Sequence, residues 1–203
     1  MSAAQKKSER TRPRPTWLGS FLRGLALWIV PVIVVWMLLT PVYNRMLSGT
    51  VENLYQLVES PNATLLLPID RHSVNVSRRD FPPSRANLYR IRVTDLHFPF
   101  VLLGAFFLAV PAVPFTLRLR RLGWAALFFV LFHLVLLILW VQFVYATQLG
   151  AWSAEHYGPF ARNSWGLAKH VTDLVVKPAL PFVLWAAFYL RHLLPSRPPE
   201  AAA

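Results

Sequence analysis

The sequence predicts an all-α polytopic membrane protein: four transmembrane helices, with a small extracytoplasmic α+β insertion between the first and the second. Of its 203 residues, 55% are hydrophobic and only 15% are charged. Several apolar runs without Lys, Arg, Asp or Glu reach about 20 residues, enough for a helix to cross the ~30 Å hydrocarbon core at ~1.5 Å per residue. The net charge of +12 lies largely beside these runs. Such flanking charge indicates membrane orientation rather than nucleic-acid binding.

The first predicted span is 24–43, "GLALWIVPVIVVWMLLTPVY". It follows a basic tail, residues 1–23, which is rich in Pro, Lys and Arg and which we expect to be disordered. The run is longer than the ~7–15 apolar residues of a cleavable signal peptide, and no small-residue cleavage site follows it. We therefore interpret it as a retained signal anchor.

The second and third predicted spans, 98–117 and 122–149, are separated by "RLRR", residues 118–121. On insertion scales each arginine in the hydrocarbon core costs ~2.5–3.5 kcal/mol. The cluster is therefore predicted to be a cytoplasmic turn, in which Arg118, Arg120 and Arg121 determine the topology of the two flanking helices.

The fourth predicted span, 171–190, is weaker, because its apolar core "PALPFVLWAAFYL" is short. It crosses the bilayer only if Lys177 lies in its outer turn and extends its amine toward the headgroups. The alternative is a re-entrant or interfacial segment. An extracytoplasmic loop, 150–170, precedes this span, and a cytoplasmic tail, 191–203, follows it.

The distribution of basic residues predicts the orientation. With both termini in the cytoplasm, the cytoplasmic parts hold 11 Lys and Arg in about 40 residues, and the outside parts hold 10 in about 80. This asymmetry follows the positive-inside rule. The predicted localisation is the cell inner (plasma) membrane, and the bilayer is the first predicted partner.

The outside segment, 44–97, changes its hydrophobic period along its length. Val51, Leu54, Tyr55 and Val58 recur at helical spacing, which predicts a short amphipathic helix. Apolar and polar residues then alternate in "SVNVS" and "LYRIRVT", which predicts two or three short strands. The segment is too poor in apolar residues to be stable alone, so we expect it to pack on the bilayer, the helix ends or a partner.

Chemistry-bearing residues are sparse. The absence of Cys excludes disulfides, thiolate metal sites and cysteine nucleophiles. The six histidines do not form a metal-binding pattern, so neither a metal nor another cofactor is expected. His133, near the middle of the third span, is either a neutral hydrogen-bonded imidazole or, with Gln142, part of the pathway of a small transporter or channel subunit.

A second polar group lies in "KHVTDLVVK", where Lys169, Asp173 and Lys177 share one side of a helix. His170 comes three residues before Asp173, so the two could act as base and orienting group in an intramembrane enzyme. The competing interpretation is a charge ladder that anchors the end of the helix.

The overall layout resembles the bacterial exosortase H-associated membrane proteins. A basic tail leads into a first span, an outside segment with short strands follows, and "LHFPFVLLGAFFLAVP" opens the next of three further spans. The similarity covers about residues 17–194. Exosortases depend on Cys with Arg and His, and this chain has no Cys. The resemblance therefore implies a non-enzymatic accessory protein beside an exosortase-like transpeptidase, in the sorting of surface proteins.

Overall fold

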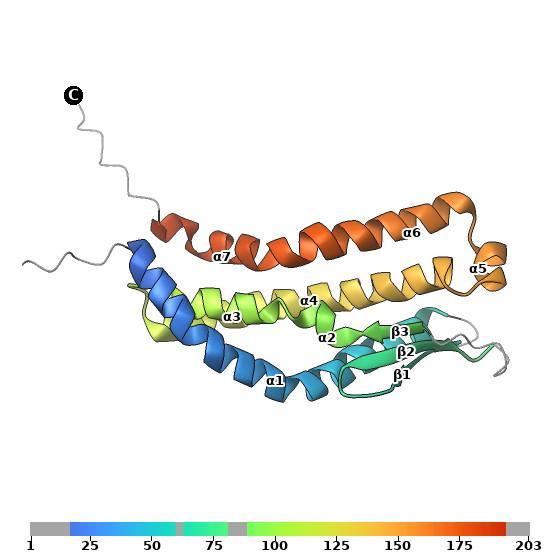
Figure 1. Cartoon of the computed structure of the whole chain (residues 1–203), viewed down its shortest axis with the longest axis horizontal. Helices are drawn as coiled ribbons and strands as arrows, with labels where there is room; N and C mark the ends of the chain where they lie inside the picture. Colours follow the sequence, from blue (N-terminus) through green and yellow to red (C-terminus); the bar gives the residue numbers. More distant parts are fainter. Residues whose placement is uncertain (1–16, 60–62, 81–88, 194–203) are drawn as a thin grey trace, which may run out of the picture.

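A computed structural model describes residues 17–59, 63–80 and 89–193 of the chain. Four helical stretches, each called a pass below with no statement about the membrane, run along one long axis, and the three-stranded sheet lies at the end opposite the two chain termini (Figure 1). Most of the two predicted cytoplasmic tails, residues 1–16 and 194–203, lies outside the described residues, whereas 17–23 and 191–193 are helical. The helical segments are α1 (Trp17–Val58), α2 (Val93–His97), α3 (Phe100–Ala109), α4 (Phe115–Thr147), α5 (Ala151–His156), α6 (Pro159–Val171), the π-helical η2 (Thr172–Val176) and α7 (Lys177–Leu193).

The first helix is longer than predicted. The sequence predicted a span at 24–43 and a separate amphipathic helix after it, but α1 is one helix of 42 residues, about 60 Å long. Pro31 and Pro41 lie inside it without ending it. Between Tyr43 and Val58 the chain has no proline, so nothing stops the helix as it leaves the apolar stretch.

The strands form an antiparallel sheet of order β1-β2-β3, with β1 (Thr64–Pro68), β2 (Ser73–Arg78) and β3 (Tyr89–Arg92). Leu66 pairs with Val76, and Val74 pairs with Ile91. These four side chains are buried on one face of the sheet, as the alternation in the sequence requires. The predicted strand at "SVNVS" is therefore confirmed, and the one at "LYRIRVT" is confirmed for Tyr89–Arg92, whereas Val93 already begins α2.

The sheet packs on the outer halves of α1 and α4 rather than standing alone. Its buried face joins Leu47, Val51 and Tyr55 of α1 and Leu136, Leu137 and Val141 of α4 in one hydrophobic core. This packing supplies the apolar partner surface that the sheet needs. In the following text, the outer layer denotes this sheet, α1 after Tyr43, α4 after His133, and α5.

The connection between the second and third passes differs from the prediction. The predicted span 98–117 ends early, because α3 stops at Ala109 and the turn lies at 110–114. The "RLRR" residues predicted as the turn are instead helical, near the start of α4. Pro111 and Pro114 account for the shift, because each disfavours helical backbone in the preceding valine. Val110 is accordingly extended, and Ala112 has a positive φ of 62°.

The third pass, α4, has 33 residues and is about 50 Å long, well beyond the ~30 Å hydrocarbon core. Its apolar run is long because its second half belongs to the core of the outer layer. Leu136, Leu137, Val141, Val144 and Tyr145 are all at most 2% exposed there. The apolar face of α4 therefore has different surroundings in the first and the second half of the helix.

The last pass begins earlier than predicted. The sequence predicted a loop at 150–170 and a span from 171, but α6 already begins at Pro159 and continues through η2 into α7. Proline is favoured at the first position of a helix, where its missing N–H has no partner to lose. Within the described part of the chain, three helices are long and apolar enough to cross a membrane: Trp17–Val58, Phe115–Thr147 and Pro159–Leu190. The segment Val93–Ala109 is a shorter apolar helix.

Candidate functional site

A chain of hydrogen bonds crosses from α1 to α2 and on to the hairpin between β1 and β2. Trp36 Nε1 donates to His97 Nδ1 at 3.0 Å, and His97 Nε2 lies 2.7 Å from Asn44 Oδ1. Asn44 Nδ2 then donates to the Arg71 carbonyl at 2.7 Å and to Thr94 Oγ1 at 3.1 Å. We call Trp36, His97, Asn44 and Thr94 the polar relay.

The donors and acceptors of the polar relay fix the tautomer of His97. The indole of Trp36 can only donate, so His97 Nδ1 must accept and the neutral ring carries its proton on Nε2. That proton is donated to Asn44 Oδ1, which leaves the Asn44 amide free to donate twice. Asn44 and His97 are 6% and 1% exposed, so every polar group of this pair is satisfied inside the protein.

His133 lies beside the relay in the middle of α4 and is fully buried. Its Nδ1 is 2.8 Å from the Tyr43 hydroxyl, while its Nε2 has no hydrogen-bond partner among the described residues. The rings of Phe129 and Phe100 enclose it at centroid distances of 4.7 and 5.1 Å. Aromatic side chains therefore enclose the ring, and only its Nδ1 has a hydrogen-bond partner among the described residues.

An apolar groove of about 330 Å³ runs below the relay between α1, α3 and α4. One end of its lining is polar, with Thr40, Tyr43 and His97, and its wall includes the exposed side chains of Val35 and Leu39. Gly104 lets α1 approach α3, since a Cβ there would meet Val32 Cγ1 at 2.9 Å. Apart from its polar end, the groove offers only van der Waals contact.

In the polar ladder of the last pass, two lysine amines and one indole N–H converge on a single carboxylate. Asp173 binds Lys169 Nζ at 3.3 Å and Lys177 Nζ at 3.1 Å, and Trp140 Nε1 of α4 donates to it at 3.3 Å. The Lys169 amine also lies 4.1 Å from the centroid of the Trp140 ring. His170 turns away, with its Nδ1 2.6 Å from the Gly166 carbonyl. The structure thus brings together the charge ladder rather than a His170–Asp173 pair.

The three "RLRR" arginines have different surroundings. The Arg118 guanidinium donates to the carbonyls of Leu108 at 2.7 Å and Val113 at 2.8 Å, which closes the end of α3. Arg121 lies over the Tyr189 ring of α7 at 4.9 Å, and Arg120 is exposed. Arg118 therefore satisfies backbone acceptors that the proline-rich turn leaves without helical donors.

Arg78 joins the sheet to α4 and α5 in the outer layer. Its guanidinium bonds Asp80 at 2.9 Å and lies 4.5 Å from the Trp152 ring centroid and 4.9 Å from that of Tyr145. The hydrogen bond from Arg78 lowers the pKa of Asp80. The pKa of Asp70 is also lowered, first by the backbone N–H of His72.

Sequence reasoning found His133 and the Asp173 ladder but missed the relay. Trp36, Asn44 and His97 meet across 53 to 61 residues of chain, and no local spacing indicates that contact. The only sequence signal was a polar residue at the edge of an apolar run, in "TPVYN" and "DLHFPF".

Comparisons with known protein families, with curated proteins and with solved structures find no match to this chain.

Proposed function

We propose that the chain spans the inner membrane four times, with α2 and α3 together as the second pass and with both termini in the cytoplasm. Residues 93–109 pack along the apolar stretch of α1, since Gly24 meets Ala109 at one end and Trp36 bonds His97 at the other. The 17 residues would cover about 25 Å, close to the hydrocarbon thickness. The excess of Lys and Arg at the end away from the sheet supports this orientation.

Within the membrane this protein acts as a non-enzymatic accessory subunit that binds an integral-membrane partner. One observation carries the proposal: the most apolar window of α1 is only 6% buried, against 33% for α4. Leu27, Val34 and Leu38 are 71%, 50% and 72% exposed along it. A helix that packs on one side only leaves a long lateral surface for another helix.

The layout resemblance names the class of partner, an exosortase-like transpeptidase. An accessory role agrees with the chemistry of the described residues, whose polar groups mostly bond one another. The outer layer would then stand beside the partner's active site and contact the passing substrate.

Co-purification from native membranes tests the proposal. The variant Leu27→Ala/Val34→Ala/Leu38→Ala trims the exposed face of α1, and Leu127→Ala/Leu131→Ala/Val135→Ala trims the comparably exposed face of α4. We expect a stoichiometric membrane partner with the wild type and the α4 variant, and its loss with the α1 variant. Equal recovery with both variants, or no membrane partner with the wild type, would contradict the proposal.

A transporter or channel subunit is the second candidate, because His133 Nε2 has no partner among the described residues. Flux in reconstituted vesicles that is lost in His133→Ala would favour it. The enclosing phenylalanine rings leave His133 without contact to water, so a pathway would need them to move. The intramembrane enzyme is a third alternative, and it requires turnover that disappears in His170→Ala or Asp173→Ala.

A further inference from the structure

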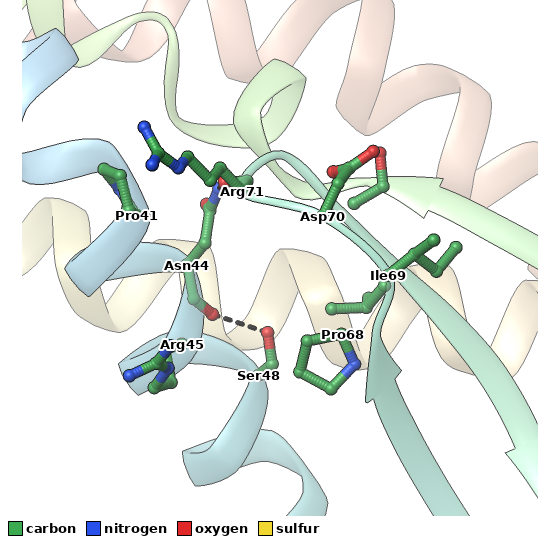
Figure 2. A pocket seen from close by; sticks show the side chains of 10 residues that line it. Pro41, Asn44, Arg45, Ser48, Pro68, Ile69, Asp70 and Arg71 are labelled. Atoms are coloured by element: carbon green, nitrogen blue, oxygen red, sulfur yellow. Dashed lines mark hydrogen bonds between the residues drawn. The ribbon is translucent and has the colours of Figure 1, made fainter.

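A second cavity, of about 290 Å³, lies on the opposite side of the relay from the apolar groove. It is bounded by α1 at Pro41–Ser48 and by the loop that joins β1 to β2 (Figure 2). The same Asn44 that completes the polar relay forms part of its wall. The cavity therefore lies at the junction between α1 and the sheet.

Two arginines give this cavity its charge. Arg45 of α1 and Arg71 of the loop both line it, and both side chains extend past Asn44 on the side away from Asp70 (Figure 2). Neither guanidinium forms an ion pair within residues 17–59, 63–80 and 89–193. Asp70 also lines the cavity, but it is bound by Arg90 and by the N–H of His72. Both arginine charges are therefore left uncompensated.

Two serines complete the wall of the cavity without offering a free donor. Ser73 lines it, but the residue is only 2% exposed and its Oγ is buried, so the hydroxyl is not accessible from the cavity. The neighbouring Ser48 hydroxyl is already used, because it donates to the Asn44 carbonyl (Figure 2). The arginine side chains are therefore the donors that a ligand in the cavity would meet.

The depth of the cavity along α1 identifies the acceptor. Arg45 is the first charged residue after the uncharged run that ends at Tyr43. An arginine one turn beyond such a run lies at the level of the lipid phosphates, where Arg forms paired hydrogen bonds to phosphate oxygens.

We propose that this cavity binds the phosphate group of a membrane lipid headgroup. Arg45 donates to the phosphate oxygens from α1, and Arg71 donates to them from the loop that joins β1 to β2. This site is separate from the partner surface on α1 and does not depend on it. It does require that α1 crosses the bilayer.

Titration of the detergent-purified full-length protein with phosphatidylglycerol, followed by native mass spectrometry, tests the site. Diacylglycerol with the same acyl chains is the control ligand without phosphate. We expect phosphatidylglycerol to bind and diacylglycerol not to bind at this site. In Arg45→Gln/Arg71→Gln the apparent affinity should fall by about tenfold or more, the equivalent of one lost charge-assisted contact.

The matched control is Arg79→Gln/Arg92→Gln, which removes the same charge from two exposed arginines outside the cavity, one just after β2 and one at the end of β3. It should keep wild-type affinity. An equal loss in both double variants, or a loss in neither, overturns the proposal. Arg45→Lys/Arg71→Lys keeps the charge but loses the paired hydrogen bonds and should weaken binding several-fold, which provides a second measurement if the glutamine variant does not fold.

Binding of inorganic phosphate is the last measurement. If phosphate ions alone bind with the same dependence on Arg45 and Arg71 while phosphatidylglycerol does not, the lipid assignment is wrong and the site takes a soluble phosphate. If phosphatidylglycerol binds and excess phosphate ions compete weakly, the lipid is the ligand.

Discussion

The two halves of α1 differ in the burial of their apolar side chains. From Trp17 to Leu39 none of the described side chains is buried, and Leu27 and Leu38 are more than 70% exposed. From Thr40 onward a single stripe turns inward at helical spacing, formed by Thr40, Asn44, Leu47, Ser48, Val51 and Tyr55. The change occurs within one continuous helix, so it cannot come from a change of secondary structure.

The difference is the one expected if α1 leaves the lipid near Thr40. In lipid, an outward leucine has apolar neighbours and gains little from packing inside the protein. In water, the same leucine gains free energy only by burial, so the helix needs one apolar face against a core. The polar relay lies at this boundary, where His97 and Asn44 still have to find their partners inside the protein.

Leucine-to-alanine substitutions in the two halves should give the largest contrast. Leu47→Ala removes a side chain that is 3% exposed and leaves a cavity in the outer layer, at an expected cost of about 2–5 kcal/mol in the free energy of unfolding. Leu38→Ala alters a side chain that is 72% exposed and should change stability by less than about 0.5 kcal/mol. Equilibrium unfolding in mixed micelles measures both, and equal costs would break the comparison.

The next effect lies at the boundary itself. Asn44→Leu removes the partner of His97 Nε2 and both donors to Arg71 and Thr94, so we expect a loss of about 2–3 kcal/mol in stability. Asn53→Leu, in the same helix but exposed, should change stability by less than about 0.5 kcal/mol. Thermal unfolding in detergent compares the two, and a neutral Asn44→Leu would show that the relay does not stabilise the junction.

A smaller effect is expected at the end of the bundle away from the sheet. Arg118→Lys keeps the charge but loses the paired bonds to Leu108 and Val113, at about 1–2 kcal/mol. Arg120→Lys changes an exposed arginine and should be neutral. If positive charge alone matters at "RLRR", both lysine variants will behave alike in reporter fusions after residue 121 and in thermal unfolding.

The smallest effect concerns pH in the outer layer. Arg78 lowers the folded-state pKa of Asp80 below its unfolded value of about 3.9, so the stabilisation is present above that pH and is lost as pH falls through the folded value. Because the Asp80 side chain is 42% exposed, the loss should be less than about 1 kcal/mol. Hydrogen exchange of β2 between about pH 5 and pH 3 should show it, and Asp80→Asn should abolish that part of the dependence.

Local patterns in the sequence predicted the strands and the apolar helices correctly, since alternation and run length are properties of neighbouring residues. The ends of the passes were harder to predict. The turn was predicted at 118–121 because of the three arginines there. The backbone instead turns at 110–114, where two prolines follow valines. Pro31 and Pro41 leave α1 continuous, so a single proline is not enough to end a helix in this chain.

The candidate site was predictable only where its residues are close in sequence. Lys169, Asp173 and Lys177 are spaced by one helical turn, and the structure joins them as the spacing suggests. Tyr43 and His133 are 90 residues apart, and Trp36 and His97 are 61 apart. Those contacts depend on how the passes pack, which no short stretch of sequence encodes.

The shortness of α3 has a consequence for biosynthesis. It has ten residues, eight of them buried, so it covers only about 15 Å and has almost no surface of its own to offer lipid. Such a segment is not expected to move from the translocon into lipid by itself. The next segment to be synthesised is the strongly apolar α4. We expect α3 and α4 to enter the bilayer together as a hairpin, with Arg118 already bonded across their turn. Nascent chains just long enough to expose α3 but not α4 outside the ribosome should therefore leave α3 uninserted, while chains that expose both helices should protect it.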